Sequence, residues 1–138
     1  MALLVGAGLL TTLAASAAAD DWPRLRPGLW EFTRTTHSSR APGKPQLIRN
    51  TRCTDPEADM KQQNARLTGA GCVFSPVIHR GNTFAFSSQC KIARMSVRSK
   101  SVLIVDSPTA YRLHVDTIED GAAGKEDLVA RRVGDCRK

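Results

Sequence analysis

Residues 93–116 read ARMSVRSKSVLIVDSPTAYRLHVD, and polar and apolar residues alternate on both sides of the Ser107-Pro108 pair. Before this pair, one parity holds the apolar residues Met95, Val97, Leu103 and Val105, and the other holds Arg94, Ser96, Arg98 and Lys100. After it, Tyr111, Leu113 and Val115 alternate with Arg112, His114 and Asp116. Successive side chains of a strand point to opposite faces of a sheet, so the pattern predicts two half-buried strands joined by a turn.

Similar segments precede and follow this stretch. Residues 28–36 place Trp30 and Phe32 on one face, and residues 46–53 return after a polar loop at 38–45. Further strands are expected at 73–79, 83–91 and 127–133, with Arg80-Gly81-Asn82 and residues 119–124 as turns and with Phe74, Ile78, Phe84 and Phe86 as core candidates. We therefore expect a mainly β fold: a single curved antiparallel sheet, an up-and-down meander tending to a half-barrel or small barrel. A β-sandwich is the alternative.

One helix is predicted, around residues 55–67. Thr54 can cap it, Glu57 follows three residues later as in a capping box, and Pro56 is tolerated in the first turn. The helix should end before Gly69. Its apolar stripe is thin, so we expect it to lie against the edge of the sheet; the residues concerned are Ala58, Met60, Lys61, Ala65 and Leu67.

The four cysteines are Cys53, Cys72, Cys90 and Cys136. They include no C-x-x-C pair, and no histidine stands at ligand spacing, so neither a metal site nor another cofactor is expected. An even number of cysteines in an exported chain predicts two disulfides. Three connectivities are possible; we favour Cys53–Cys72 with Cys90–Cys136, because Cys53 precedes the predicted helix and Cys72 follows it.

The first 19 residues carry no charge and end in Ala17-Ala18-Ala19 before Asp20. This pattern is typical of a signal peptide, although the basic start is missing, and an uncleaved anchor is the alternative. We expect residues 1–19 to be a signal peptide and residues 20–138 to form a single disulfide-stapled β domain in the periplasm. No transmembrane helix is expected after signal cleavage.

The chain has 138 residues, a formal net charge of +7 and only 5% aromatic residues. A 41% hydrophobic and 24% charged composition is that of a folded chain rather than of a disordered or integral membrane protein. The positive charge favours anionic partners, such as a lipid headgroup or an envelope protein. Nucleic acid is not expected as a partner, because stacking aromatics are scarce and the compartment is wrong.

The motifs G-x-S-x-G, H-E-x-x-H, the P-loop and G-x-G-x-x-G do not occur in the sequence. The histidines His37, His79 and His114 fall on three predicted strands, and Asp116 shares a face with His114. We expect this pair to be a hydrogen-bonded surface pair, with a catalytic role as the alternative.

Glu31 lies next to Trp30 in the first predicted strand. We expect it to face solvent or to pair with an arginine, and an acid with a raised pKa is the alternative. Trp30 itself is expected to be a core anchor rather than a stacking platform.

A positively charged face is the most suggestive feature of the pattern. Its predicted members are Arg94, Arg98 and Lys100, joined across the next strand by Arg112. Such a strip would bind an anionic ligand; alternatively, its charges prevent aggregation between strands.

Five short blocks together resemble one known family. They are Pro27-Gly28-Leu29-Trp30-Glu31, Cys53-Thr54-Asp55-Pro56-Glu57-Ala58, Gly71-Cys72, Cys90 and Val133-Gly134-Asp135-Cys136. Their order and spacing over residues 27–137 are similar to those of the bacterial envelope proteins of domain-of-unknown-function family 3617. The resemblance implies an exported, usually periplasmic protein with paired cysteines and no assigned activity, and it supplies no catalytic residues.

These observations favour a non-enzymatic binding or interaction module for an apolar or anionic envelope ligand, held by a curved sheet. Two alternatives remain open. One is a structural factor that binds another envelope protein, and the other is a small hydrolase that uses His114 and Asp116.

Overall fold

The computed structural model describes residues 21–137, so the predicted signal peptide at 1–19 lies outside the described residues. Within residues 21–137, one helix and eight strands follow one another. They are β1 (Gly28–Ser38), β2 (Ala41–Thr54), α1 (Pro56–Ala70), β3 (Cys72–Phe74), β4 (Ile78–Arg80), β5 (Thr83–Ile92), β6 (Met95–Ser107), β7 (Ala110–Glu119) and β8 (Ala122–Gly134).

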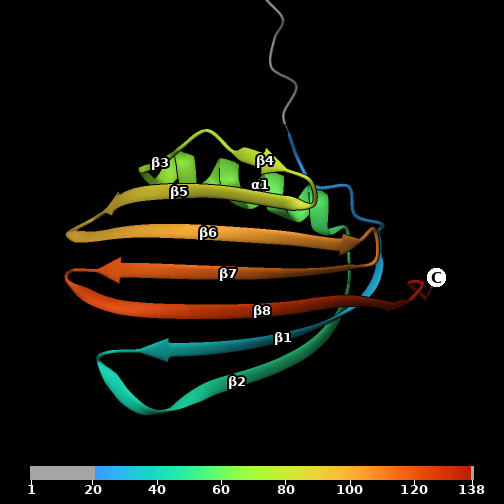
Figure 1. The fold of residues 1–138 in the computed structure, drawn as a ribbon, viewed down its shortest axis with the longest axis horizontal. Coiled ribbons are helices and arrows are strands. Elements are labelled where there is room, and N and C mark those ends of the chain that lie inside the picture. The colour runs from blue at the N-terminus through green and yellow to red at the C-terminus, as the bar shows by residue number, and fades with distance from the viewer. Residues whose placement is uncertain (1–20, 138) are drawn as a thin grey trace, which may run out of the picture.

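All eight strands form one antiparallel sheet in the order β2-β1-β8-β7-β6-β5-β3, with β4 also paired to β5 (Figure 1). This confirms the mainly β class, the single sheet and the meander from β5 to β8. The sheet stays open, with β2 at one edge and β3 and β4 at the other. The sequence left open whether the sheet forms a half-barrel or a small closed barrel. The open sheet corresponds to the half-barrel.

The sheet order joins distant parts of the chain. The first strand pairs with the last, so the hairpin of β1 and β2 extends the meander beyond β8. The chain must then pass from β2 at one edge to β3 at the other, and α1 makes this crossing (Figure 1). We call the face of the sheet turned toward α1 the inner face, and the opposite face the outer face.

The hairpin is longer than the sequence predicted. The expected loop at 38–45 is a tight turn at Ser39-Arg40 followed by strand, so β2 begins at Ala41 and contains Pro42 and Pro45. Proline cannot donate a ladder hydrogen bond and is tolerated where one side of a strand is unpaired. The edge position of β2 meets this condition, which explains why a proline-containing segment remains a strand.

The core lies on the inner face around Trp30, whose side chain is 0% exposed. Trp30 Nε1 donates a hydrogen bond of 3.0 Å to the Arg26 carbonyl oxygen, and its ring lies 5.7 Å from that of Tyr111. The core cluster consists of Leu25, Trp30, Phe32, Phe84, Leu103, Tyr111, Leu128 and Ala130. Trp30 is therefore the core anchor that the sequence predicted.

One predicted core residue is wrong. Ile78 is 59% exposed, because the strand expected at 73–79 is divided into β3 and β4 at Ser75-Pro76-Val77. This interruption removes the simple alternation between Phe74 and Ile78. Ile78 pairs with Ala85, which belongs to the outer face.

The helix has other boundaries than expected. Its N-cap is Asp55 rather than Thr54, and the Asp55 side chain accepts a hydrogen bond of 3.1 Å from the Ala58 backbone N–H. Proline is best accommodated as the first helical residue, which makes the residue before Pro56 the cap. The helix also continues past Gly69.

Gly71 ends the helix. Its φ of 113° is left-handed, and a Cβ built there would lie 2.6 Å from the Lys91 carbonyl oxygen of β5. A glycine is therefore required where the helix turns onto the sheet.

The favoured disulfide pairing is wrong. Cys53 is bonded to Cys136, with a Cα–Cα distance of 5.6 Å, and Cys72 is bonded to Cys90, with a Cα–Cα distance of 4.0 Å. The physical reason is the length of α1: its 15 residues span about 22 Å, far beyond the reach of a disulfide between Cys53 and Cys72.

The second favoured pair fails because of strand direction. β5 and β8 are separated by two strands and run antiparallel, so Cys90 near the end of β5 and Cys136 after the end of β8 lie at opposite ends of the sheet. The actual bridges attach each end of the α1 crossing to the sheet.

Candidate functional site

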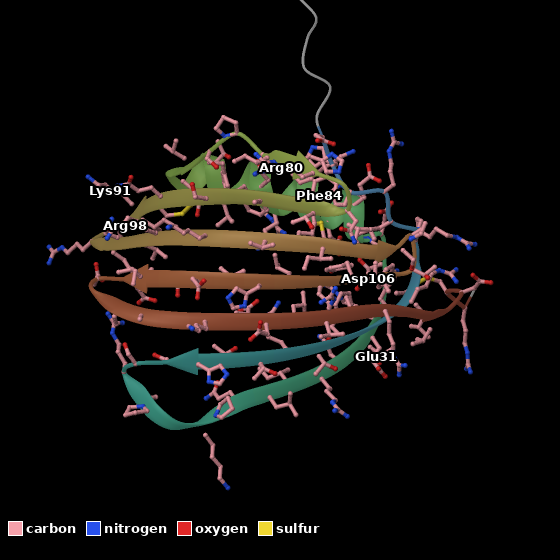
Figure 2. All side chains as sticks on the ribbon, in the orientation of Figure 1. Glu31, Arg80, Phe84, Lys91, Arg98 and Asp106 are labelled. Carbon is pink, nitrogen blue, oxygen red and sulfur yellow. A yellow bond between two sulfur atoms is a disulfide. The ribbon has the colours of Figure 1, made fainter. Side chains whose placement is uncertain are left out.

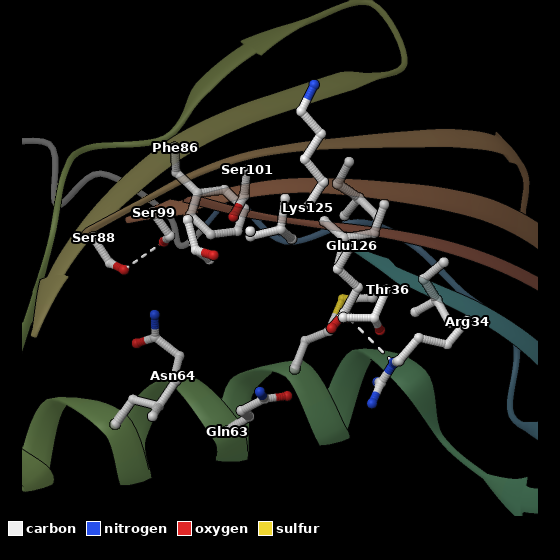
Figure 3. A pocket seen from close by; sticks show the side chains of 18 of the residues that line it. Arg34, Thr36, Gln63, Asn64, Phe86, Ser88, Ser99, Ser101, Lys125 and Glu126 are labelled. Atoms are coloured by element: carbon white, nitrogen blue, oxygen red, sulfur yellow. Dashed lines mark hydrogen bonds and ion pairs between the residues drawn. The ribbon is translucent and has the colours of Figure 1, made fainter. Parts of the chain in front are cut away.

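A cavity of about 720 Å³ lies between the inner face and α1. Its sheet side is formed by inward-pointing residues of β1, β2 and β5 to β8. Its helix side includes Met60, Gln63, Asn64 and Leu67 of α1. Gln63 and Asn64 lie on the turns of α1 that face the sheet (Figure 3). The sequence predicted a helix against the sheet edge; α1 does contact the edge strand β3, and it also covers this cavity.

Apolar side chains line the part of the cavity near the start of β5. Strand register aligns Phe84, Leu103, Leu113 and Leu128 across four neighbouring strands. The next row contains Tyr111, Ala130 and Phe32. Met60 of α1 packs against this cluster, so both sides of the cavity are apolar here.

Hydroxyl groups replace the apolar side chains farther along the same strands. We call Ser88, Ser99, Ser101 and Thr117 the hydroxyl cluster. Register places Ser99 between Ser88 and Thr117, while Ser101 is the next inward residue of β6. Asn64 and Gln63 lie opposite the three serines on α1 (Figure 3). The polarity of the cavity therefore changes along the strand direction.

The hydroxyl cluster is only partly bonded within itself. The Ser88 and Ser99 oxygens are 2.7 Å apart and share a hydrogen bond. Ser101 is 6% exposed and lines the cavity, and residues 21–137 contain no buried side-chain N or O atom that lacks a hydrogen-bond partner. At Gly124 a Cβ would lie 2.6 Å from the Thr117 hydroxyl oxygen, so the glycine leaves room for that group.

Six of the charged residues that line the cavity form three ion pairs. The pairs are Arg34–Glu126 at 3.2 Å, Arg40–Glu119 at 3.0 Å and Arg52–Asp59 at 3.3 Å. In each pair both partners line the cavity. Each arginine therefore already has a carboxylate partner, and Arg52 also lies 5.1 Å above the Phe32 ring.

Tyr111 is the one cavity residue with a large pKa change among those described. Burial raises the pKa of the Tyr111 phenol to about 12, with smaller effects from the Arg52 and Asp59 charges. The phenol is therefore protonated throughout the physiological range, and its hydroxyl adds a neutral group to the apolar part of the cavity.

His114 and Asp116 do come together, but on the outer face. His114 Nδ1 lies 2.6 Å from Asp127, which sequence reasoning missed, and Nε2 lies 3.3 Å from Asp116. The hydrogen bond with Asp127 is the main cause that raises the pKa of His114; its slight burial lowers it, and the two negative charges raise it further. Both ring nitrogens are engaged, as in a surface ion-pair triad.

The other histidines are placed separately from this triad. His79 Nδ1 lies 2.7 Å from Asp21, and its ring stacks on Phe84 at 3.9 Å. His37 lies near the end of β1. The described structure therefore does not assemble the three histidines into one site.

Glu31 accepts a hydrogen bond of 2.9 Å from Arg131 Nε on β8, which confirms the predicted arginine partner.

The predicted basic strip is not continuous. Arg98 and Lys100 share the outer face of β6, while Arg94 lies in the turn between β5 and β6. Lys100 is paired in register with Asp116. Arg98 and Lys91 lie toward one end of the sheet and Asp106 toward the other (Figure 2).

Arg112 is separated from the rest of the strip. It pairs in register with Ile104 and donates hydrogen bonds of 3.0 and 2.9 Å to Asp106. The Arg112 hydrogen bonds lower the pKa of Asp106, opposed by a small effect of burial. Arg112 is therefore paired with Asp106 and does not form a continuous basic strip with Arg94, Arg98 and Lys100.

The fold and cavity define a class of protein: an open antiparallel sheet whose inner face is covered by a crossover helix, with a cavity between the two. Residues 25–136 match the family model described as "Protein of unknown function (DUF3617)", and the chain belongs to that family. No curated protein and no solved structure matches the chain.

Two features are absent from residues 21–137. In this part of the chain no helix is long and apolar enough to cross a membrane. Nor does it contain a group of three or more side chains suited to hold a metal ion.

Proposed function

We propose that this protein is a non-enzymatic binding module of the bacterial periplasm that takes an amphipathic small molecule into the cavity beneath α1. The observation that carries the proposal is the cavity itself. Its volume of about 720 Å³ lies within the range of about 300 to 1,000 Å³ typical of small-molecule sites.

The polarity of the lining supports an amphipathic ligand. Leu103 and Leu113 represent the apolar part, and Ser99 and Ser101 represent the hydroxyl part of the same two-sided cavity. A ligand that is apolar throughout would remove the Ser101 hydroxyl from water without supplying a partner, which is unfavourable. A ligand with one polar end satisfies both parts.

The other candidates have less support. For a hydrolase, His114 would need a free ring nitrogen near a nucleophile and a cavity; both nitrogens face carboxylates on the outer face instead. For a protein-binding factor, a large contiguous apolar surface is expected, whereas the exposed large apolar residues of the described chain are distributed over β2, β3, β4, β6, β7 and β8 and the segment between β3 and β4. The cavity beneath α1 favours a small ligand.

Binding of the neutral apolar dye N-phenyl-1-naphthylamine tests the proposal. We expect saturable binding to one site, measured by fluorescence. Val115→Trp places a large ring into the cavity and is expected to weaken binding at least about tenfold. Val129→Trp places the same ring on the outer face and serves as the matched control, expected to bind as the parent does.

Two results would overturn the binding proposal. One is a parent protein that does not bind the dye while its unfolding transition is intact. The other is equal binding by both tryptophan variants, which would place the dye outside the cavity.

The periplasmic part is tested separately, by mass spectrometry of protein purified from cell envelope extracts. A chain beginning near Asp20 is expected, and a cytosolic chain with residues 1–19 retained would contradict that part.

A further inference from the structure

We infer that the cavity holds its ligand in one orientation, with an uncharged, hydroxyl-bearing head group at the hydroxyl cluster and an acyl-type tail over the apolar rows. This inference rests on the proposed function and specifies the ligand class for the same site. It follows from three observations: the direction of the polarity change, the state of the hydroxyl groups and the pairing of the charges.

The direction of the polarity change sets the orientation. Along β6, the residues that line the cavity are Ser99, Ser101 and Leu103 in that order. Along β5, Phe84 and Phe86 are followed by Ser88. Because β5 and β6 are antiparallel, both sequences place serine at the same end of the cavity. A tail therefore lies toward Phe84 and Leu103, and a head group toward Ser88 and Ser99.

The hydroxyl groups determine what the head can be. Serine and threonine hydroxyls both donate and accept hydrogen bonds, as do the amides of Gln63 and Asn64 as whole groups. Ser101 lines the cavity and is only 6% exposed, so a ligand in the cavity can reach its hydroxyl. A head group with its own hydroxyls can satisfy both donors and acceptors, whereas a phosphate offers mainly acceptors at neutral pH.

The charges at the cavity margin argue against an anionic head. Arg34, the arginine that points into the space beneath the sheet in Figure 3, is paired with Glu126. An anion at this arginine would lie beside the Glu126 carboxylate and would have to displace it. Arg40 and Arg52 are likewise paired with carboxylates, those of Glu119 and Asp59. Lys125 is not paired in this way, but its ammonium group points away from α1 (Figure 3).

This conclusion narrows the ligand class suggested by the sequence. A net charge of +7 favours anionic ligands in general. In the cavity, however, the described cations are either paired with carboxylates or turned away. The excess positive charge therefore belongs to the outside of the molecule.

A series of twelve-carbon amphiphiles tests the head group in dye-displacement titrations below their micelle concentrations. The probes are 1-monododecanoylglycerol, dodecyl phosphate and dodecyltrimethylammonium. We expect the glycerol ester to bind at least about tenfold more tightly than either charged probe. Tighter binding of dodecyl phosphate, lost in Arg34→Gln, would overturn the inference in favour of an anionic head.

The double variant Ser99→Ala with Ser101→Ala tests the position of the head. The double variant is expected to bind the glycerol ester about tenfold more weakly, which corresponds to the loss of one or two hydrogen bonds. Its affinity for the apolar dye should not change. Ser96→Ala, an exposed position on the outer face of the same strand, is the matched control.

The possible failures are distinguishable. The inference about the head group fails if the parent binds the dye but binds all three amphiphiles with equal affinity. It also fails if the double serine variant binds the glycerol ester as tightly as the parent does. In both cases the proposal that the cavity binds a small molecule is still supported. If the parent binds neither dye nor amphiphile, the proposed function fails as well.

Discussion

The inner and outer faces of the sheet are made by the same strands but treat polar groups differently. Leu128 on the inner face is 7% exposed, and its neighbour Val129 on the outer face is 51% exposed. On the outer face, histidine and carboxylate side chains form solvent-exposed ion pairs with one another, as in the His114 triad. The inner face instead directs neutral hydroxyls at the cavity beneath α1. The two faces therefore differ in how their polar groups are satisfied: by charge pairing on the outer face, and by neutral groups facing a cavity on the inner face.

The largest expected effect concerns the two disulfides that hold α1 over the inner face. They close loops of very different length, with sequence separations of 83 for Cys53–Cys136 and 18 for Cys72–Cys90. In the chain-entropy description, the longer loop stabilises by about 4.6 kcal/mol and the shorter by about 3.2 kcal/mol.

Urea unfolding with and without reductant measures each bridge. In Cys72→Ala/Cys90→Ala, reductant breaks only Cys53–Cys136 and should cause the larger loss of unfolding free energy. In Cys53→Ala/Cys136→Ala it breaks only Cys72–Cys90, with a smaller loss. Thiols stay in place in both comparisons, so packing changes little. A larger loss for the short loop would contradict the expectation.

The second prediction compares adjacent residues on the two faces. Leu128→Ala removes a side chain from the core cluster and should lower the free energy of unfolding by about 3 kcal/mol. Val129→Ala removes an exposed side chain and should change it by less than about 0.5 kcal/mol. Chemical denaturation of both variants measures the difference. Equal effects would mean that the two faces are not distinguished by burial.

The difference between the faces was largely predictable from the sequence. Alternation around Leu103 and Tyr111 correctly predicted which side chains are buried, because one face of a strand repeats every two residues. The hairpin, the meander and the single helix follow from equally local signals. The length of β2 does not, because prolines are tolerated only at a sheet edge, and the position of a strand in a sheet is not a local property.

The disulfide error had a different origin. The spacing of Cys53 and Cys72 around one helix suggested a bridge, although the length of that helix excludes it. The sequence also contained the information that β5 and β8 run in opposite directions, given the predicted meander. Combining these two expectations would have left only the observed pairing or Cys53–Cys90 with Cys72–Cys136.

The cavity was harder to predict. Ser99 and Ser101 share the parity of Leu103, and this interruption of an apolar face was the available signal. Its meaning depends on α1, because small hydroxyl residues leave a space only if a helix stands off the sheet. The side of the sheet on which α1 crosses is set by tertiary packing and not by the composition of the helix, whose inward residues include the amides Gln63 and Asn64.

The smallest expected effect is the pH dependence of the outer face. The raised pKa of His114 means that the folded state binds its proton more tightly than the unfolded state, for which a pKa of 6.5 applies. The contribution of protonated His114 to the free energy of unfolding is therefore fully present below pH 6.5, and it is lost as the pH rises through the pKa of His114 in the folded state. Asp127→Asn should reduce this dependence more than Asp116→Asn, because the hydrogen bond with Asp127 is its main cause. Urea unfolding from pH 5 to 9, with a direct NMR titration of His114, measures both effects.

His114→Gln is the control, since neither aspartate variant should change the pH dependence once the imidazole is absent. A steeper effect of Asp116→Asn than of Asp127→Asn would contradict the assignment. The inner face should behave differently over the same range, because burial raises the pKa of the Tyr111 phenol to about 12. Dye binding to the cavity should therefore stay constant between pH 6 and 8, while the free energy of unfolding changes. A change of pH alone then distinguishes the inner face from the outer face.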